Sequence, residues 1–380
     1  RQLNLPNSTP SKSGLFIGLM SGTSVDGVDA ALVRIDGQSI LLEHTYTYEL
    51  PENLTGELHR LSVSETYQVD RIGQLHRILG DLFAEASLEL IKDYGITASD
   101  VQAIGSHGQT IRHRPDAAGL APAFTWQIGD AHTIAQKTRI TTIADFRGRD
   151  LAASGQAAPL APLFHKAMLG AEQSGAVLNI GGLANATISE KGVIKHGFDT
   201  GPGNTLIDTW CRLHLGCPFD TGGDWARSGI IQPALLSHWL CDTYFAKTPP
   251  KSTGREHFNH DWLVANTASL ERYRPQDIAA TLTELTAVSC AQSIIQNSTA
   301  PSNIYVCGGG SHNTYLMERI EAHSGAYQVA TTRELGIDPD WVEAAAFAWL
   351  AYARINDQRF DLHSITGSKG EVPLGIIYPV

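Results

Sequence analysis

Asp199 is the residue best placed in this sequence for acid–base chemistry. It stands at the end of a predicted strand, in the segment 196–204 (His-Gly-Phe-Asp-Thr-Gly-Pro-Gly-Asn), directly before a turn. A carboxylate at the mouth of a binding site can serve as a general base. An aspartate in this position can also cap a turn or a helix by accepting backbone N–H groups. The spacing alone leaves both interpretations open.

Three glycine-rich turns, each after a predicted apolar strand, have the composition of phosphate-binding loops. They are 21–24 (Ser-Gly-Thr-Ser), 179–182 (Asn-Ile-Gly-Gly) and 307–310 (Cys-Gly-Gly-Gly). Glycine adopts positive φ and lets backbone N–H groups approach phosphate oxygens closely. The sequence has no P-loop motif (GxxxxGK followed by Ser or Thr), and none of the turns fits GxGxxG. We therefore expect the three turns together to hold a nucleotide in another way.

Two further polar segments suit sugar or anion binding. Ser106 and His107 lie in the segment 105–110 (Gly-Ser-His-Gly-Gln-Thr), which we predict to be a flexible polar loop that hydrogen-bonds sugar hydroxyls. The alternative is a plain surface turn. Arg147 and Arg149 follow another predicted strand and can grip a carboxylate or a phosphate. The alternative here is a solvated cluster of salt bridges.

Glu343 lies inside the apolar helix that we predict at Trp341–Ala353. A carboxylate close to a buried face is costly to leave without a partner. Two roles fit this position. Glu343 either stabilises the start of its helix or belongs to the binding site.

The elements that position these residues follow one pattern twice. An apolar strand runs into a glycine-rich turn, and a second strand, a hairpin turn, a third strand and a helix follow. The first copy comprises strands Leu15–Met20, Val28–Ile35 and Ile40–Leu50, helix Tyr67–Lys92, and strands Val101–Gly105, Phe124–Ile128 and Ile140–Phe146. The second copy comprises strands Ala176–Ile180, Ala186–Ser189 and Val193–Phe198, helices Thr205–Leu213 and Ile278–Ile295, and strand Asn303–Cys307.

This repeat predicts an α/β protein of two similar domains with a ligand in the cleft between them. A chain of 380 residues is also longer than one core comfortably serves. Domain I is assigned to 14–150 plus 341–380, with the first phosphate turn and the sugar-side loops. Domain II is assigned to 174–340, with the second phosphate turn, Asp199 and an adenosine-side turn, and 151–173 is a connecting segment.

Composition excludes several classes of protein. The net charge is −11 and no basic stripe is present, so we expect no nucleic-acid partner. Five cysteines without a CxxC pair favour buried reduced thiols over disulfides or a zinc site. The polar stretch 1–14 lacks a signal-peptide core, and no uninterrupted apolar run approaches the ~20 residues of a membrane span. We expect a cytoplasmic protein without a membrane segment.

The segment 16–29 (Phe-Ile-Gly-Leu-Met-Ser-Gly-Thr-Ser-Val-Asp-Gly-Val-Asp) resembles the opening signature of the anhydro-N-acetylmuramic acid kinase family. The resemblance runs from about residue 14 to the end, with further motifs in order and with compatible gaps. These motifs are 105–110, 127–130, 179–182, 197–204, 250–256, 306–310 and the pair 366–367.

The resemblance implies two duplicated ribonuclease-H-like domains of the actin and hexokinase type, ATP and Mg²⁺ as cofactors, and a homodimer. It also implies a reaction of peptidoglycan recycling. Water opens the anhydro bridge of 1,6-anhydro-N-acetylmuramic acid, and ATP phosphorylates the released oxygen to give N-acetylmuramic acid 6-phosphate and ADP. Asp199 matches the family's catalytic aspartate. The expected ATP-binding residues are Gly22, Thr23, Ser24, Val25, Asp26, Gly27, Val28, Asp29, Gly181, Gly182, Gly308, Gly309 and Gly310, and the expected sugar-side residues are Ser106, His107, Arg147, Arg149 and Glu343.

The sequence departs from related kinases in three places. Many actin-like kinases carry a metal-organising aspartate near the end of the first strand, where this chain has Met20, and Asp26 and Asp29 are both candidates to replace it. The metal ligands therefore stay unknown. The family usually has a third arginine at Gly148, and Gly-Gly-Gln-Gly at 154–157, where this chain has Ser-Gly-Gln-Ala. These two changes bear on sugar affinity and leave the reaction class unaffected.

Two other functions are compatible with the same fold. One is an ordinary sugar kinase that phosphorylates a hydroxyl without opening a ring. The other is a nucleotide-binding regulator without catalysis, against which the presence of Asp199 argues. Sugar-dependent ATP turnover and the oxygen content of the product separate the three.

Overall fold

The computed structural model describes residues 12–22, 25, 27–37, 39–64, 66–115, 122–170, 173–254 and 257–380. The chain divides into two compact units. Unit 1 comprises Arg1–Ala158 and Glu343–Val380, and unit 2 comprises Pro159–Val342. The segment 151–173, treated above as a connection, is thus divided between the units. Helix α4 ends at Ala152 in unit 1, and helix α5 lies in unit 2.

Unit 1 is built on a six-stranded sheet with the strand order β15-β7-β4-β1-β2-β3 among the described residues. The strands of unit 1, inside and outside this sheet, are β1 (Gly14–Met20), β2 (Gly27–Asp36), β3 (Ser39–Glu49), β4 (Val101–Ser106), β5 (Gln109–Arg114), β6 (Phe124–Ile128), β7 (Thr142–Ala144), β13 (Phe360–Asp361), β14 (Glu371–Val372) and β15 (Ile376–Tyr378). Its helices are α1 (Glu52–Val63), α2 (Val69–Tyr94), α3 (Ala131–Thr138), α4 (Gly148–Ala152), α12 (Val342–Ile355) and α13 (His363–Thr366).

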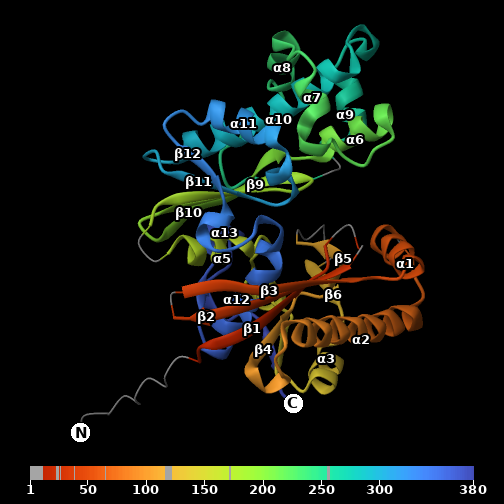
Figure 1. The fold of residues 1–380 in the computed structure, drawn as a ribbon, viewed down its shortest axis with the longest axis vertical. Helices are drawn as coiled ribbons and strands as arrows, with labels where there is room; N and C mark the ends of the chain where they lie inside the picture. The colour runs from red at the N-terminus through yellow and green to blue at the C-terminus, as the bar shows by residue number, and fades with distance from the viewer. Residues whose placement is uncertain are drawn as a thin grey trace. The chain divides into compact units, whose positions relative to one another are not determined.

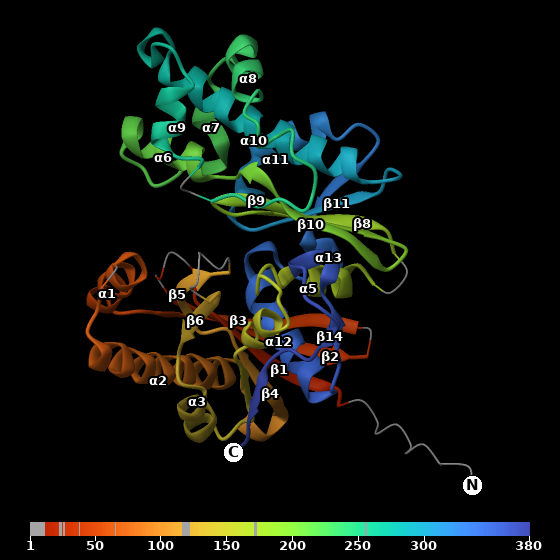
Figure 2. The same cartoon turned by 180° about the vertical axis from the view of Figure 1, so that it is seen from behind.

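Helix α12 packs directly on the strands of this sheet because two of their residues are glycines. A Cβ atom on Gly18 of β1 would lie 1.8 Å from the Ala344 carbonyl oxygen, and one on Gly105 of β4 would lie 2.0 Å from that of Phe347. Side chains at these positions would push the helix away. Figures 1 and 2 show α12, drawn in blue, beside the red strand β1 in both views. Helix α2 packs against β1, β2 and β3.

Unit 2 is built on a five-stranded sheet with the strand order β10-β9-β8-β11-β12. Its strands are β8 (Gly175–Ile180), β9 (Leu183–Glu190), β10 (Val193–Pro202), β11 (Asn303–Cys307) and β12 (Gln328–Thr331). Its helices are α5 (Ala161–Leu169), α6 (Thr205–Leu215), α7 (Asp224–Arg227), α8 (Pro233–Trp239), α9 (His260–Ala265), α10 (Pro275–Asn297) and α11 (Thr314–His323). Helices α10 and α11 form a core with the sheet, and α6 to α10 enclose a second core that contains three tryptophans.

The two sheets share one topology. In each, the first three strands form an antiparallel meander, and the fourth and fifth run parallel to the first on its other side. Unit 1 adds β15 antiparallel to β7 at its edge. This strand order, with helices on the sheets, is that of a duplicated ribonuclease-H-like protein. The predicted fold class is therefore confirmed.

The structure corrects the local prediction for the segment 105–110. The segment 105–110 is not a free loop, because Gly105 and Ser106 end β4 and Gln109 and Thr110 begin β5. His107 and Gly108 alone connect the two strands. Gly108 has φ +75° and lies so close to the backbone of β6 that a Cβ would meet the Ile128 carbonyl oxygen at 2.8 Å.

Helix α10 is the element of the described residues that has the length and composition of a membrane span, with a mean hydropathy of 1.4 in its most apolar window. The structure buries 89% of that window. Core helices of water-soluble proteins pass the same test, so this helix is weak evidence for a membrane segment. All five cysteines are free, but Cys217 and Cys241 are exposed, which corrects the prediction that all are buried.

Candidate active site

Asp199 lies on β10 at a β-bulge, where the pairing with β9 shifts register between Asp199 and Gly201. Bulges re-aim a side chain and are frequent beside active sites. A later segment holds Asp199 in place. Its N–H donates to the Lys251 carbonyl (3.1 Å), its Oδ2 accepts the Thr253 N–H (3.0 Å), and its carbonyl accepts the Tyr244 hydroxyl (2.7 Å).

The hydrogen bond between the Asp199 carboxylate and the Thr253 N–H is not that of a local turn or helix cap. An Asx-turn or a helix cap would place the donor two or three residues away, whereas Thr253 is 54 residues from Asp199 along the chain. The cap position of the next helix, α6, is held by Asn204. Thr253 also has a buried hydroxyl oxygen without a hydrogen-bond partner in the described part of the chain. Buried polar atoms without a hydrogen-bond partner are rare in proteins, and a ligand-binding site is one place where they occur.

The environment of Asp199 changes its acidity. Burial raises the pKa of its carboxyl group to about 6, and the Thr253 N–H and the charge of Lys251 oppose this rise. The Lys251 ammonium lies 4.9 Å from the ring centroid of Tyr244 and 5.8 Å from that of Phe198, and burial lowers its pKa. A carboxyl group with a pKa near neutrality can take up and release a proton under physiological conditions.

The second glycine-rich turn packs against the loop that follows Asp199. The N–H groups of Asn204 and Thr205 donate to the carbonyls of Gly181 (2.8 Å) and Gly182 (2.9 Å). A Cβ on Gly203 would lie 2.4 Å from the Gly181 carbonyl oxygen. These contacts fix the turn between β8 and β9 next to the start of α6.

The third glycine-rich turn lies against the same end of β8. Gly308 has φ +79°, and a Cβ on it would lie 2.4 Å from Asn179 Oδ1. A Cβ on Gly310 would lie 2.3 Å from the last side chain of β8. By contrast, a Cβ on Gly309 would meet only Asn204 Nδ2, at 4.0 Å. Packing therefore requires Gly308 and Gly310, whereas Gly309 borders open space into which a ligand can fit.

The first glycine-rich turn is described in part. Thr23, Ser24 and Asp26 lie outside the described residues. Gly22 accepts the Val25 N–H through its carbonyl (3.3 Å), and Val25 is buried with φ +55°. The buried Ser21 hydroxyl donates to the Gly27 carbonyl (3.0 Å), which closes the turn.

Gly27, Val28 and Asp29 are the first residues of β2. Asp29 pairs across the sheet with Met20, the last residue of β1, and accepts the Thr47 hydroxyl through Oδ1 (2.8 Å). Cβ atoms of such antiparallel partners are about 5 Å apart. A carboxylate on β2 thus lies opposite the end of β1.

In unit 1, the buried His107 and the half-buried Arg147 form a hydrogen-bonded pair. The Arg147 guanidinium donates from Nε (3.1 Å) to His107 Nε2, and its Nη2 lies 3.0 Å from the same atom. Because Nε2 accepts, Nδ1 carries the proton and donates to the Gly108 carbonyl (2.8 Å). Burial and the charge of Arg147 lower the pKa of His107 to about 3. His107 is therefore neutral and holds Arg147 in one orientation.

The other two residues predicted on the sugar side are exposed. Arg149 lines a separate cavity with Arg354, so the structure does not bring it together with Arg147. Glu343 stands in the first turn of α12, where a carboxylate stabilises the helix. Glu343 itself is exposed, whereas its neighbours Val342 and Ala344 are buried. Burial of the carboxyl group raises the pKa of Glu343, and the charge of Arg147 opposes this rise.

Two departures from the family pattern fall at strained backbone positions. Ser154 has φ +69° and Ala157 has φ +63°, a conformation that favours the glycines which the resemblance leads us to expect there. Hydrogen bonds hold this segment in place. The Ala157 N–H donates to the fully buried Asp150 (2.7 Å), which also accepts the Thr366 hydroxyl (2.7 Å). The Ala157 carbonyl accepts from Arg147 (2.8 Å), so the segment also supports the His107–Arg147 pair.

Sequence reasoning missed the neighbours of Asp199. Lys251 and Thr253 belong to the motif at 250–256, which the resemblance singles out without a role, and its residues 255–256 lie outside the described residues. Tyr244 carries no signal in the sequence, because its contact with Asp199 joins residues 45 positions apart.

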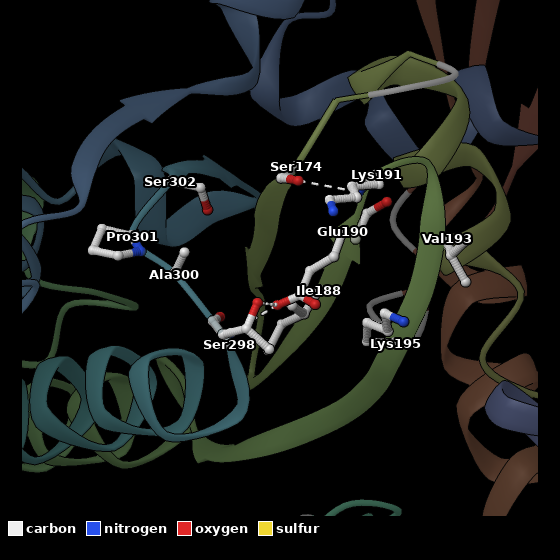
Figure 3. A pocket seen from close by; sticks show the side chains of 12 residues that line it. Ser174, Ile188, Glu190, Lys191, Val193, Lys195, Ser298, Ala300, Pro301 and Ser302 are labelled. Atoms are coloured by element: carbon white, nitrogen blue, oxygen red, sulfur yellow. Dashed lines mark hydrogen bonds between the residues drawn. The ribbon is translucent and has the colours of Figure 1, made fainter.

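A cavity of ≈ 410 Å³ lies at the hairpin end of β9 and β10, and none of the predicted site residues lines it. Figure 3 shows Glu190, Lys191 and Lys195 around it, with the Lys191 N–H donating to Ser174 Oγ (3.0 Å). Glu190 already accepts both the N–H and the hydroxyl of Thr299. The cavity is therefore separate from the glycine-rich turns at the other end of these strands.

Solved structures resemble this chain weakly. An activator of 2-hydroxyisocaproyl-CoA dehydratase from Clostridium difficile matches with a TM-score of 0.44 and 10% identity, over 90% of this chain and 96% of that one. A ROK family glucokinase from Streptomyces griseus matches with a TM-score of 0.38 and 13% identity, over 89% and 99%. Scores below 0.5 do not establish a shared fold, and the assignment of the fold rests on the strand order.

Similarity in sequence is much stronger. The anhydro-N-acetylmuramic acid kinase of Xanthomonas axonopodis is 47% identical over 97% of this chain and 98% of its own length. The enzyme of the same name from Coxiella burnetii is 46% identical over 96% and 97%. The family model for anhydro-N-acetylmuramic acid kinase matches residues 14–380. This chain therefore belongs to the anhydro-N-acetylmuramic acid kinase family.

Proposed function

We propose that this protein is an ATP-dependent carbohydrate kinase that opens 1,6-anhydro-N-acetylmuramic acid with water and phosphorylates it, and that Asp199 is the general base. Family membership supports the reaction. One observation supports the role of Asp199. Its carboxylate is half-buried at a β-bulge, has a pKa of about 6, and accepts a backbone N–H on only one of its two oxygens in the described part of the chain.

The reaction requires a base and a phosphoryl acceptor. Water attacks the anomeric carbon, and Asp199 takes its proton while its negative charge favours the positive charge that develops on the sugar. The bond from the anomeric carbon to the bridging oxygen breaks, and that oxygen bonds to the γ-phosphorus as ADP leaves. An inverting glycosidase needs a second carboxylic acid to protonate the leaving oxygen. Here the γ-phosphoryl group captures it, so one carboxylate suffices.

The acidity of Asp199 fits this task. With a pKa of about 6, roughly nine in ten Asp199 carboxylates are ionised at pH 7. The same carboxylate is a stronger base than an ordinary aspartate, which favours proton uptake from water. Lys251 and the Thr253 N–H keep the group ionised despite its burial.

The glycine-rich turns supply the nucleotide site. In unit 2, we assign phosphate and adenosine contacts to Gly181, Gly182 and the turn 308–310, where Gly309 borders open space. In unit 1, we assign ATP contacts to the turn that begins at Gly22. Backbone N–H groups in such turns stabilise the phosphates without side-chain entropy cost, and phosphoryl transfer depends mainly on this positioning.

Magnesium fits the oxygen donors near these turns. The described residues contain no group of three or more His, Cys, Asp or Glu that could form a closed metal site. Mg²⁺ needs only one or two carboxylates in kinases, because phosphates and water complete its shell. Asp29 would hold it from its place opposite the end of β1. When bound, the ion neutralises charge on the phosphates.

The sugar side of the proposal rests on unit 1. The neutral His107 holds the Arg147 guanidinium in a defined orientation. Ser106 has a buried hydroxyl without a hydrogen-bond partner among the described residues. We assign direct sugar contact to Ser106, Arg147 and Glu343, and a supporting role to His107. We further propose that the enzyme acts in the cytoplasm in peptidoglycan recycling, and as a homodimer.

The test compares Asp199→Asn with the wild type and with Asp261→Asn, a control whose side chain is fully exposed. ADP formation is measured with and without 1,6-anhydro-N-acetylmuramic acid, and ATP affinity is measured by calorimetry. We expect Asp199→Asn to lower kcat by about 10²–10⁴-fold with ATP affinity unchanged, and the control to behave as wild type. Strong residual activity of Asp199→Asn would remove the base assignment. ATP turnover that ignores the sugar would refute the proposed function.

A further inference from the structure

A cavity of ≈ 320 Å³ opens in unit 1 beside the predicted sugar-side residues. It lies where β4 and β7 end, between β6, α3 and β15. The described residues that line it are His76, Ser106, His107, Gly108, Thr125, Trp126, Gln127, Gly129, Asp130, Ala131, His132, Ala144, Asp145 and Tyr378. Its volume falls in the range of small-molecule sites, about 300–1,000 Å³. Nothing in the mechanism above uses most of these side chains.

The cavity contains a buried hydroxyl group without a partner. Ser106 is 1% exposed, lines the cavity, and its Oγ has no hydrogen-bond partner among the described residues. Leaving such a group unsatisfied costs about 1–3 kcal/mol, which a ligand hydroxyl or amide would recover. Hydrogen bonds also hold the backbone of Gly129 and Asp130 in the lining, because His76 Nδ1 accepts the Gly129 N–H (3.0 Å) and the His76 carbonyl accepts the Asp130 N–H (3.0 Å).

An exposed tryptophan stands at the rim. Trp126 on β6 is 46% exposed although it lines the cavity. An indole offers a large, rigid apolar face beside polar groups, and that combination suits a ligand with one apolar and one hydroxylated surface. Phe124, two residues earlier on the same face of β6, is exposed to 43% and does not line the cavity.

The charge of the lining selects against anions. None of the described lining residues is Lys or Arg, and two are carboxylates, Asp130 and Asp145. Asp130 accepts the His132 N–H (3.1 Å) and the Thr133 hydroxyl, and Asp145 accepts the Gly148 N–H (3.0 Å). Asp130 also borders a neighbouring cavity that Arg77 and Lys137 line. Within the lining described here, carboxylates without a lysine or arginine among them repel phosphate and carboxylate ligands and accept hydroxyl groups well.

We propose that this cavity is a subsite for an uncharged sugar ring, which stacks on Trp126 and hydrogen-bonds to Ser106, Asp130 and Asp145. The subsite extends the sugar side of the enzyme toward substrates with a second, neutral saccharide unit. The inference rests on the proposed function in taking Ser106 as a sugar contact. Sugar binding to the cavity itself requires neither ATP nor turnover.

The test measures binding of N-acetylglucosamine, without nucleotide, by saturation-transfer NMR and by tryptophan fluorescence. Trp126→Ala is compared with the matched control Phe124→Ala, since both remove an exposed aromatic ring from the same face of one strand. We expect the wild type and Phe124→Ala to bind equally and Trp126→Ala to bind about tenfold more weakly or not at all. Inorganic phosphate should not displace the sugar.

Ser106→Ala provides a second variant that does not depend on the tryptophan. It removes a hydroxyl without a partner, so we expect unchanged or higher thermal stability together with weaker sugar binding. The subsite is refuted if the wild type does not bind N-acetylglucosamine, if both aromatic variants bind alike, or if phosphate competes. Turnover of the anhydro sugar with ATP is measured separately. Sugar binding at Trp126 without turnover would support the subsite and refute the proposed function. Turnover without sugar binding at Trp126 would support the proposed function and refute the subsite.

Discussion

Alanine substitutions at three consecutive glycines should separate packing from nucleotide binding. Gly308 and Gly310 lie against β8, whereas Gly309 borders open space. If the turn binds ATP through close approach of its backbone, Gly308→Ala and Gly310→Ala should destabilise the protein, and Gly309→Ala should weaken ATP binding without destabilising it. The same methyl group is added each time, so each variant serves as a control for the other two.

The magnitudes follow from the geometry. At Gly308 an alanine must adopt φ +79°, at a cost of about 1 kcal/mol. Its Cβ would also meet Asn179 Oδ1 at 2.4 Å and the Ile180 carbonyl oxygen at 2.8 Å, which adds about 1–3 kcal/mol of overpacking. A loss of about 3 kcal/mol lowers the Tm of a domain of this size by roughly 6–12 °C. Gly310→Ala should behave similarly, because its Cβ would lie 2.3 Å from Ile180 Cγ2.

Gly309→Ala should leave the Tm unchanged or slightly raised. Its Cβ would approach no described atom more closely than Asn204 Nδ2 at 4.0 Å, and replacing glycine restricts the unfolded chain by about 0.4–1 kcal/mol. ATP affinity should fall by about tenfold or more, equivalent to about 1.4 kcal/mol, because the methyl group occupies the space of the ligand.

The assay is calorimetric. Scanning calorimetry without nucleotide gives the Tm, since bound ATP would itself stabilise the protein. Titration calorimetry without sugar gives the ATP affinity in the absence of turnover. Wild-type affinity in Gly309→Ala would show that this turn does not hold ATP. An unchanged Tm in Gly308→Ala or Gly310→Ala would contradict the packing described here.

Three further predictions concern acidity and backbone strain. Because Asp199 must be ionised, kcat/KM should fall as the pH drops through about 6. Lys251→Met removes a charge that lowers the pKa of Asp199, so this fall in kcat/KM should occur at higher pH in the variant. A pH profile that Lys251→Met leaves unchanged would exclude an effect of Lys251 on the pKa of Asp199. The raised pKa also means that the stabilisation from neutral Asp199 is fully present below pH 3.8 and is lost as the pH rises through about 6. Ser154→Gly and Ala157→Gly should each raise the free energy of unfolding by up to about 1 kcal/mol, because both residues have positive φ. Denaturant titration measures this change. Destabilisation by both substitutions would contradict the explanation.

The repeated strand pattern could be predicted from the sequence because short-range signals define it. Apolar strands such as 303–307 end at glycine turns, and the strands 124–128 and 303–307 were predicted with the bounds that the structure has. Helix α1 and strand β5 are among the elements that the sequence pattern does not predict, as are α3, α11 and β12. Polar residues and arginines break the alternation of β5, and its pairing with β6 supplies the stability that its own sequence does not show.

The candidate site could be predicted only where one segment carries it. The glycine turns stand at strand ends, and Asp199 directly follows the segment predicted as a strand, so both positions are visible in a sequence. The structure extends that strand, β10, beyond Asp199 to Pro202. The contacts of Lys251 and Thr253 with Asp199 join distant segments, so periodicity cannot reveal them.

The central claim is that water opens the sugar while ATP phosphorylates it, with Asp199 as the base. Turnover of 1,6-anhydro-N-acetylmuramic acid and ATP in heavy-oxygen water, followed by mass spectrometry of the sugar phosphate, tests it most directly. We predict one solvent oxygen on the anomeric carbon and none in the newly transferred phosphoryl group. A phosphorylated product without solvent oxygen at the anomeric carbon would contradict the mechanism.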